Sequence, residues 1–244
     1  MTLTIAITSD FICPWCLVAE TRLNQAIAQL NSAVEIEYLW FPFELNPQMP
    51  EAGMDRKAYR TRKFGSWEYS QGLDAKTVQA TQADNINFRY DLMTVTPNTL
   101  KAHRLTWFAG NQGKATQMAV RILNAYFTEG RNIGDVETLA TLAAEIGIDA
   151  AQVKAFLESE AGIQEVKDLE QQAMSTTVTE PVLSVAVGEA SRREGRSRSA
   201  GYAYAQGIHS VPTICIGREI ISGAQSVEVF LAALHQAVNE LATA

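Results

Sequence analysis

The first 41 residues carry strand-like and helix-like patterns of apolar and polar positions in turn. Residues 3–8 alternate apolar and polar side chains, which predicts a strand. Residues 34–41 are rich in β-branched and aromatic residues and place alternate apolar side chains on one face. Between them, an approximately helical apolar stripe ends near Asn31 and consists of Cys16, Leu23, Ile27 and Leu30. The chain is therefore predicted to begin with a β–α–β unit.

The C-terminal pattern predicts a β–β–α unit. Residues 211–216 and 219–221 read as two strands, and Gly217-Arg218 between them forms the turn of a hairpin. A final helix is indicated by a stripe made of Val227, Phe230, Leu231, Leu234, Val238 and Leu241.

The middle of the chain has helical patterns, and no comparable strand signal occurs between residues 50 and 205. Candidate helix caps are Asn98, Asp135, Asp149 and Ser159. We expect an α/β protein in which strands from both ends join one mixed sheet. The predicted boundaries are 1–45 and 206–244 for a discontinuous domain, and 46–205 for a helical insertion domain.

Composition narrows the classes of function. The chain has 244 residues, of which 47% are hydrophobic and 19% charged, so it can bury a substantial core. A net charge of −7 argues against nucleic acid as the main partner. No uncharged apolar run reaches the roughly 18 residues that a membrane helix needs. The strand pattern begins within a few residues of Met1, with no signal-peptide pattern, so we expect a cytoplasmic protein.

The chain has three cysteines, which excludes a secreted disulfide scaffold. Cys13 and Cys16 form one C-x-x-C motif, and Cys215 lies within the predicted strand 211–216, where it is expected to pack as a small apolar residue. An isolated C-x-x-C in such a chain is half of a metal site or a redox pair.

The position of the motif favours the redox pair. Cys13 would lie at a helix N-terminus, where free backbone N–H groups and the helix dipole stabilise a thiolate. Pro14 would occupy the first helical position, where its missing N–H costs nothing. Cys16, about one turn further on, could then attack a mixed disulfide on Cys13.

The two alternatives for the motif are weaker. A zinc site needs about four ligands, and Cys215, His103, His209 and His235 show no ligand-like spacing. Two inert core cysteines would not require Pro14-Trp15 between them. We therefore predict no metal.

The combination of strand, CPWC and helix with a later Val211-Pro212, hairpin and helix resembles the thioredoxin superfamily. The helical insertion makes it similar to the DsbA-like branch, which is related to 2-hydroxychromene-2-carboxylate isomerases and kappa-class glutathione transferases. Further strings resemble the FrnE-type cytoplasmic members: Ser9-Asp10, Phe43-Glu44-Leu45-Asn46-Pro47, Asn98-Thr99, Ala102-His103-Arg104-Leu105, Tyr126-Phe127, Glu129-Gly130-Arg131-Asn132-Ile133-Gly134-Asp135 and Ser222-Gly223-Ala224-Gln225.

This resemblance implies a thioredoxin fold and a thiol–disulfide oxidoreductase, with Cys13 as nucleophile and Cys16 as resolving thiol. It also implies a cis peptide bond between Val211 and Pro212, packed against the cysteines. The exposed backbone of Val211 could pair with an extended peptide or with glutathione. The expected partners are protein thiols or disulfides, or glutathione as a co-substrate, with no bound cofactor and a monomer or homodimer as the assembly.

One motif residue departs from the family pattern, and some other residues have two possible roles. Trp15 stands where DsbA-type oxidants have His, which argues against a very strong oxidant and favours an apolar substrate contact. Asp10 is expected to cap or orient the motif loop, and His103 to pack between helices. Ser222 and Gln225 either help to hold glutathione or simply cap the last helix.

Two rival functions remain open at this point. Glutathione-dependent isomerases and transferases of this fold generally have Ser where this chain has Cys13, so the intact pair argues against them. A chaperone-like protein would use the apolar surface around Trp15. Residues 175–206, which are Ser/Thr-rich and then Arg-rich, are expected to form a solvated loop or helix face rather than a docking patch.

Overall fold

The structure, a computed structural model, describes residues 1–175 and 207–243. Nearly all of the Ser/Thr- and Arg-rich segment 175–206 lies outside the described residues, so its expected character stays a prediction.

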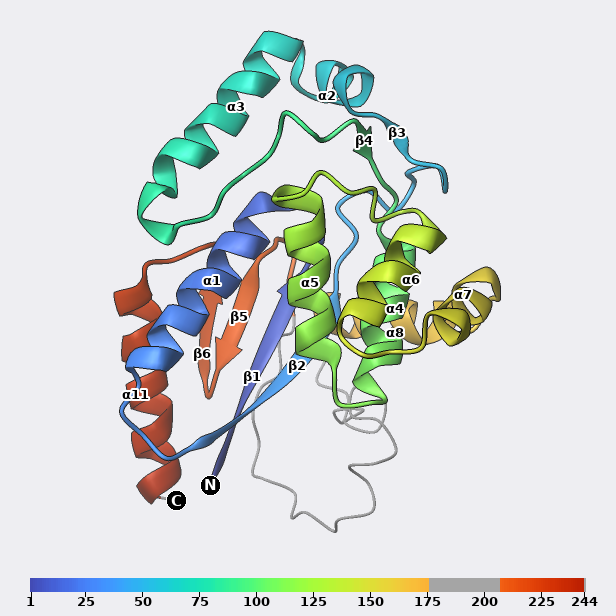
Figure 1. The fold of residues 1–244 in the computed structure, drawn as a ribbon. Coiled ribbons are helices and arrows are strands. Elements are labelled where there is room, and N and C mark those ends of the chain that lie inside the picture. The colour runs from blue at the N-terminus through green and yellow to red at the C-terminus, as the bar shows by residue number, and fades with distance from the viewer. Residues whose placement is uncertain (176–206, 244) are drawn as a thin grey trace.

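Strands from both ends of the chain form one four-stranded mixed sheet, as predicted (Figure 1). The order is β2 (Glu35–Pro42), β1 (Thr2–Ser9), β5 (Thr213–Ile216) and β6 (Glu219–Ser222). β1 is parallel to β2 and antiparallel to β5, and β5 is antiparallel to β6. The N-terminal strands and the C-terminal strands therefore meet where β1 pairs with β5. β1 is also the strand that leads into the CPWC motif.

Both faces of the sheet are buried, each by different helices. Leu3, Ile5 and Ile7 pack with α1 (Pro14–Gln29) and α11 (Val227–Thr243), which lie together over one face. Ala6 points to the other face, into a cluster that includes Leu169 of α8 (Ile163–Met174). Successive side chains of a strand point to opposite faces, so the alternating pattern predicts one buried face. The second face is buried as well because α8 packs against it.

The insertion between the two units is mostly helical. Up to residue 175, its described helices besides α8 are α2 (Arg56–Phe64), α3 (Trp67–Ala80), α4 (Leu100–Gly110), α5 (Ala115–Phe127), α6 (Val136–Glu145) and α7 (Ala150–Glu158), with a 3-10 turn, η1 (Gln82–Asp84). It is not purely helical, since β3 (Met54–Asp55) pairs with β4 (Val95–Thr96) in a two-stranded ladder. Two-residue strands are too short to give a periodic signal in the sequence.

Two of the four candidate helix caps are N-cap residues: Asp135 of α6 and Asp149 of α7 each accept a backbone N–H of the first turn. Asn98 lies one residue before Thr99, the N-cap of α4, and its side-chain oxygen accepts the backbone N–H of Leu100. The prediction for Ser159 is wrong, because Ser159 ends α7 and its hydroxyl donates to a carbonyl of that helix. α8 begins instead after Gly162, whose φ of 77° suits glycine.

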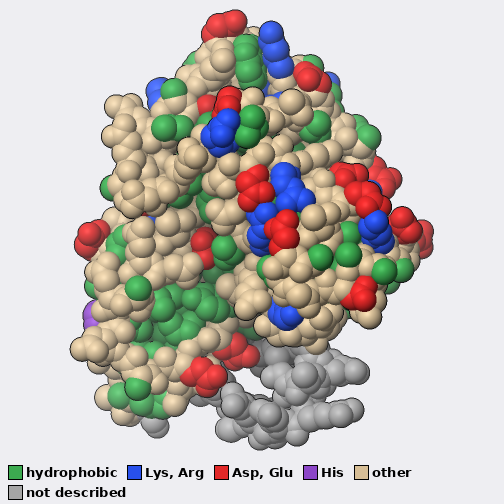
Figure 2. Space-filling model, viewed as in Figure 1, with side chains coloured by type: hydrophobic (Ala, Val, Ile, Leu, Met, Phe, Trp, Pro, Cys, Tyr) green, Lys and Arg blue, Asp and Glu red, His purple; other side chains and the backbone are tan. Residues whose placement is uncertain are grey.

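Within residues 1–175 and 207–243, no helix has the length and apolar character needed to cross a membrane. Figure 2 shows acidic and basic side chains interspersed over one face of the molecule.

Candidate active site

The CPWC motif lies at the junction of β1 and α1, as predicted. Cys13 is the N-cap residue of α1, with an extended backbone (φ −93°, ψ 111°), and Pro14 occupies the first helical turn. The backbone N–H of Cys13 donates to the carbonyl of Asp10 over 3.1 Å, which closes the loop between strand and helix. The Cys13 sulfur therefore lies at the free N–H groups of the helix terminus.

The two thiols of the motif differ in acidity. The pKa of Cys13 lies below its ordinary value, mainly because the Cys16 side chain hydrogen-bonds to it, and the backbone N–H groups of Cys16 and Trp15 add to the effect. Burial and the negative charge of Asp10 oppose that shift. Burial raises the pKa of Cys16 well above its ordinary value, and the neighbouring Cys13 raises it further. Cys13 is thus the thiol that ionises first.

The loop before β5 lies against the motif. The Val211–Pro212 peptide bond is cis, which confirms the expectation from the family resemblance. The Cys13 thiol is 3.6 Å from the carbonyl oxygen of Val211 and donates to it. The structure therefore brings together Cys13, Cys16 and the Val211 backbone across about 200 positions of sequence.

Ser222 and Gln225 lie in a turn that is tied to this loop. The N–H of Gly223 donates to the carbonyl of Pro212 over 2.8 Å. Both side chains are exposed, and the Gln225 amide donates to the carbonyl of Ser222 over 2.8 Å. These contacts describe a hydrogen-bonded turn before α11, and both roles considered for the two residues, holding glutathione or capping α11, stay predictions.

Trp15 and the neighbouring motif residues face a cavity. Trp15 is 37% exposed, the most exposed residue of the motif, and Cys13, Pro14 and Trp15 line one side of a space of about 400 Å³. The opposite side is formed by α2 and α3, which contribute Arg56, Arg60, Lys63, Asp74 and Lys76. None of these five residues was predicted from the sequence, because nothing in their spacing shows that α2 and α3 lie opposite the motif.

The side chains of Asp10 and His103 face each other in a buried position close to the motif loop. The Asp10 carboxylate accepts the backbone N–H of Leu45 over 2.8 Å, and its second oxygen is 3.5 Å from Nε2 of His103. The Phe11 ring lies 4.7 Å from the His103 ring. Asp10 thus orients the motif loop against the segment after β2, and His103 packs from α4, as the sequence suggested.

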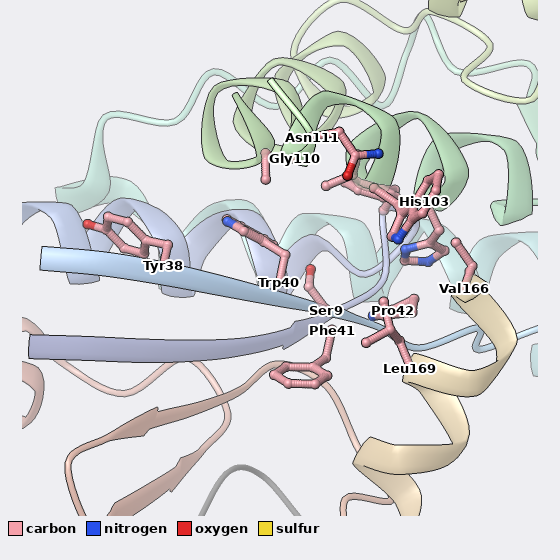
Figure 3. Close-up of a pocket in the computed structure, with 14 residues that line it drawn as sticks. Ser9, Tyr38, Trp40, Phe41, Pro42, His103, Gly110, Asn111, Val166 and Leu169 are labelled. Atoms are coloured by element: carbon pink, nitrogen blue, oxygen red, sulfur yellow. The ribbon is translucent and has the colours of Figure 1, made fainter. Parts of the chain in front are cut away.

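His103 also borders a second, much smaller space, next to the end of β1 (Figure 3). This pocket measures about 40 Å³ and lies between the ends of β1 and β2, α4 and α8, with Ser9 and Trp107 in its lining. The hydroxyl of Ser9 contacts Cys16 and lowers its pKa, an effect smaller than that of burial. The space is large enough for about one water molecule, not for a substrate.

His209, in the loop before the cis bond, is exposed. Cys215 is buried in β5, as expected. Among the residues that the structure describes, no group of three or more His, Cys, Asp or Glu side chains could hold a metal ion.

Comparison with known proteins shows the family of this chain. Residues 4–179 match the model of the DSBA-like thioredoxin domain. The chain belongs to this family. The DSBA-like chain is also 28% identical to YwbO of Bacillus subtilis (strain 168) over 231 residues, which is 94% of each protein.

Two solved structures resemble this DSBA-like protein over nearly its whole length. The probable DsbA oxidoreductase SCO1869 of Streptomyces coelicolor aligns with a TM-score of 0.75 and 27% identity, covering 98% of this chain and 91% of that one. DsbM, the cytosolic disulfide reductase of Pseudomonas aeruginosa, aligns with a TM-score of 0.54 and 17% identity, covering 99% and 98%. The second likeness concerns the fold alone.

Proposed function

We propose that this DSBA-like protein is a thiol–disulfide oxidoreductase that exchanges or isomerises disulfides through Cys13 and Cys16. One observation carries the proposal: a thiol with a lowered pKa at the start of α1 is hydrogen-bonded by a second, buried thiol. The thiolate is the nucleophilic form of sulfur, and a neighbouring thiol that keeps its proton can resolve the product.

In the reducing direction, the Cys13 thiolate attacks one sulfur of a substrate disulfide. The bond from Cys13 to that sulfur forms, the substrate disulfide breaks, and the other substrate sulfur leaves as a thiolate. Cys16 then loses its proton and attacks Cys13, which releases the second substrate thiol and leaves a Cys13–Cys16 disulfide. The substrate gains two electrons and the protein loses two; oxidation of a dithiol is the reverse sequence.

The substrate would approach beside the Val211 backbone. The carbonyl of Val211 accepts a hydrogen bond from Cys13, so a peptide paired with this segment would bring its sulfur to the reactive thiol. We propose protein thiols or glutathione as partners, with no bound cofactor and a cytoplasmic location. The solved complex of DsbM with GSH supports glutathione as a co-substrate on this fold.

Trapping of mixed disulfides tests the proposal. We expect the Cys16→Ser variant to accumulate a mixed disulfide on Cys13 with an oxidised protein or with oxidised glutathione, detected as a mass increase of the intact chain. Cys13→Ser should form none, and Cys215→Ala, which changes a cysteine outside the motif, should behave as the unchanged protein. Disulfide exchange that persists in Cys13→Ser would refute the proposal.

The same variants distinguish an oxidoreductase from the main rival function. A glutathione-dependent isomerase or transferase on this fold needs no resolving thiol. Glutathione-dependent turnover of a non-disulfide substrate that survives Cys16→Ser would therefore favour the rival, and loss of disulfide exchange in that variant favours the oxidoreductase.

A further inference from the structure

The 400 Å³ cavity beside Cys13 has the dimensions of a small-molecule site. Figure 1 places α2 and α3 beyond the N-terminal end of α1, so the cavity opens between these helices and the reactive thiol. Its walls include the rings of Tyr59, Phe64, Tyr90 and Phe127, which offer apolar surface to a bound molecule. A ligand in this space would lie within reach of the Cys13 sulfur.

The cavity is positively charged although the protein is acidic. Among the described residues, four cationic side chains line it, Arg56, Arg60, Lys63 and Lys76, against one carboxylate, Asp74. The whole chain, by contrast, carries a net charge of −7. Such a local excess of cations in a concave site attracts anions.

The two arginines are held in place before any ligand arrives. Arg56 and Arg60 share Asp74, at 2.6 and 2.8 Å from its two carboxylate oxygens. The Arg56 guanidinium lies 5.5 Å from the centre of the Tyr90 ring, and that of Arg60 lies 5.0 Å from the centre of the Phe64 ring. One carboxylate between two guanidinium groups leaves donor capacity for a second anion.

Asn46 adds a neutral donor to the same cavity. Its side-chain oxygen accepts the hydroxyl of Tyr59 over 2.5 Å, while its buried Nδ2 has no hydrogen-bond partner among the described residues. A buried amide N–H without a partner is unfavourable, and an acceptor oxygen on a ligand would satisfy it.

We infer that this cavity binds the carboxylate-bearing part of a low-molecular-weight thiol or disulfide, so that anionic small disulfides are preferred substrates of Cys13. The inference rests on the proposed function and adds the substrate class. Lys63 is exposed at the end of α2 and lines the cavity, so it would draw the carboxylate from solvent towards the two arginines.

The chemical step is the exchange described above, with the small disulfide as oxidant. Cys13 forms a bond to one substrate sulfur and the substrate S–S bond breaks, which releases one carboxylate-bearing thiolate. Cys16 displaces the second one and forms the Cys13–Cys16 disulfide. The reduced protein supplies both electrons, so a single-turnover measurement needs no further reductant.

The test compares two small aromatic disulfides on the fully reduced protein. Dithiobis-nitrobenzoate carries two carboxylates and dithiodipyridine carries none, and each releases a coloured thiol. The measured quantity is the ratio of their second-order rate constants, because a general change in Cys13 reactivity affects both. We expect Lys63→Gln to lower the ratio of anionic to neutral disulfide about five-fold, as loss of a nearby charge implies.

Lys57→Gln is the matched control. It removes the same charge from the same helix, but Lys57 is exposed and does not line the cavity, so its ratio should stay that of the unchanged protein. Lys76→Gln, from the facing helix α3, should lower the ratio as Lys63→Gln does.

The outcomes separate the two proposals. Equal ratios in Lys63→Gln, Lys76→Gln and Lys57→Gln would overturn the anion site and leave the oxidoreductase intact. Failure of the reduced, unchanged protein to react with either disulfide would overturn the proposed function itself. A lowered ratio in both cavity variants with an unchanged control supports the site.

Discussion

The acidity of Cys13 depends more on one neighbouring thiol than on the helix terminus. The hydrogen bond from the Cys16 side chain is the largest cause of its lowered pKa, and the backbone N–H groups of the first turn rank below it. The position of the motif at a helix start predicted the contribution of the helix terminus. It did not predict the hydrogen bond from Cys16, because that contact depends on how the two side chains are oriented in the fold.

Removing that donor should raise the pKa of Cys13. We expect Cys16→Ala to shift the midpoint of the pH dependence of Cys13 alkylation upwards, because the thiolate loses its principal hydrogen bond. Cys16→Ser keeps a hydroxyl donor at the same position and should shift the midpoint less. Alkylation rates measured across pH by mass spectrometry give both midpoints, and an unchanged midpoint in Cys16→Ala would contradict the assignment.

Asp10 should change the pKa of Cys13 in the opposite direction to Cys16. Its negative charge raises the pKa of Cys13, while its carboxylate also holds the backbone N–H of Leu45. Asp10→Asn keeps an oxygen for that hydrogen bond and removes the charge, so we expect the alkylation midpoint of Cys13 to move to lower pH. A midpoint that moves upwards would show that the carboxylate acts through the loop geometry instead.

At the scale of elements, Arg104 joins α4 to the end of α7. Its guanidinium, which is buried, donates to four backbone carbonyls at and beyond the C-terminal end of α7: Phe156 (2.8 Å), Leu157 (3.2 Å), Ser159 (2.7 Å) and Ala161 (2.9 Å). The last carbonyls of a helix have no partner within it, and a cation there also suits the helix dipole.

Arg104→Met should therefore destabilise the protein by about 3 kcal/mol, because it keeps the apolar stem but leaves buried carbonyls unpaired. Arg121→Met is the control: Arg121 lies on α5 and pairs with Glu129 and Glu145 at the surface, where ion pairs contribute about 0–1 kcal/mol. Denaturant unfolding of both variants gives the comparison. Equal losses of stability would show that the four carbonyls find other partners.

Elements with a periodic pattern or a capping side chain were predictable, and those set by tertiary contacts were not. Asp135 and Asp149 cap the helices that they were expected to cap, because the capping bond is local. Ser159 has the same chemistry but closes α7, since Gly162 provides the start of α8. The β3–β4 ladder depends on a pairing across about 40 residues that no local pattern records.

At the scale of the whole molecule, the sheet was predictable and the cavity was not. Apolar runs at both chain ends predicted a mixed sheet, and burial then fixes which face each strand presents. The cations of the cavity come from α2 and α3, and only the packed fold places them opposite Cys13. The two-domain division stays a prediction. One core cluster joins Phe11, just before the motif, and Cys16 within it to residues of α4 and α5.

The stability of the whole fold should fall as pH rises through 7. Burial raises the pKa of Glu20 and of Glu44 to about 7, in the second case against an opposing effect of His103. In the unfolded chain these carboxyls lose their protons at about pH 4.3. Between these values the folded state holds protons that the unfolded state has lost, so raising the pH favours unfolding, and the loss is complete above pH 7.

Glu20→Gln should remove the contribution of Glu20 to the pH dependence of folding stability. The amide is neutral and keeps an oxygen for the hydrogen bond that Asn24 donates to Glu20. We expect the variant to be more stable than the unchanged protein by about 2 kcal/mol at pH 8, and equal to it at about pH 4, where the buried carboxyl is protonated in the folded state and largely so in the unfolded chain. Glu158→Gln, at an exposed position of α7, should show no such difference at either pH. Denaturant unfolding at the two pH values measures it, and a stabilisation of Glu20→Gln that is the same at both would mean that the Glu20 carboxyl is not the titrating group.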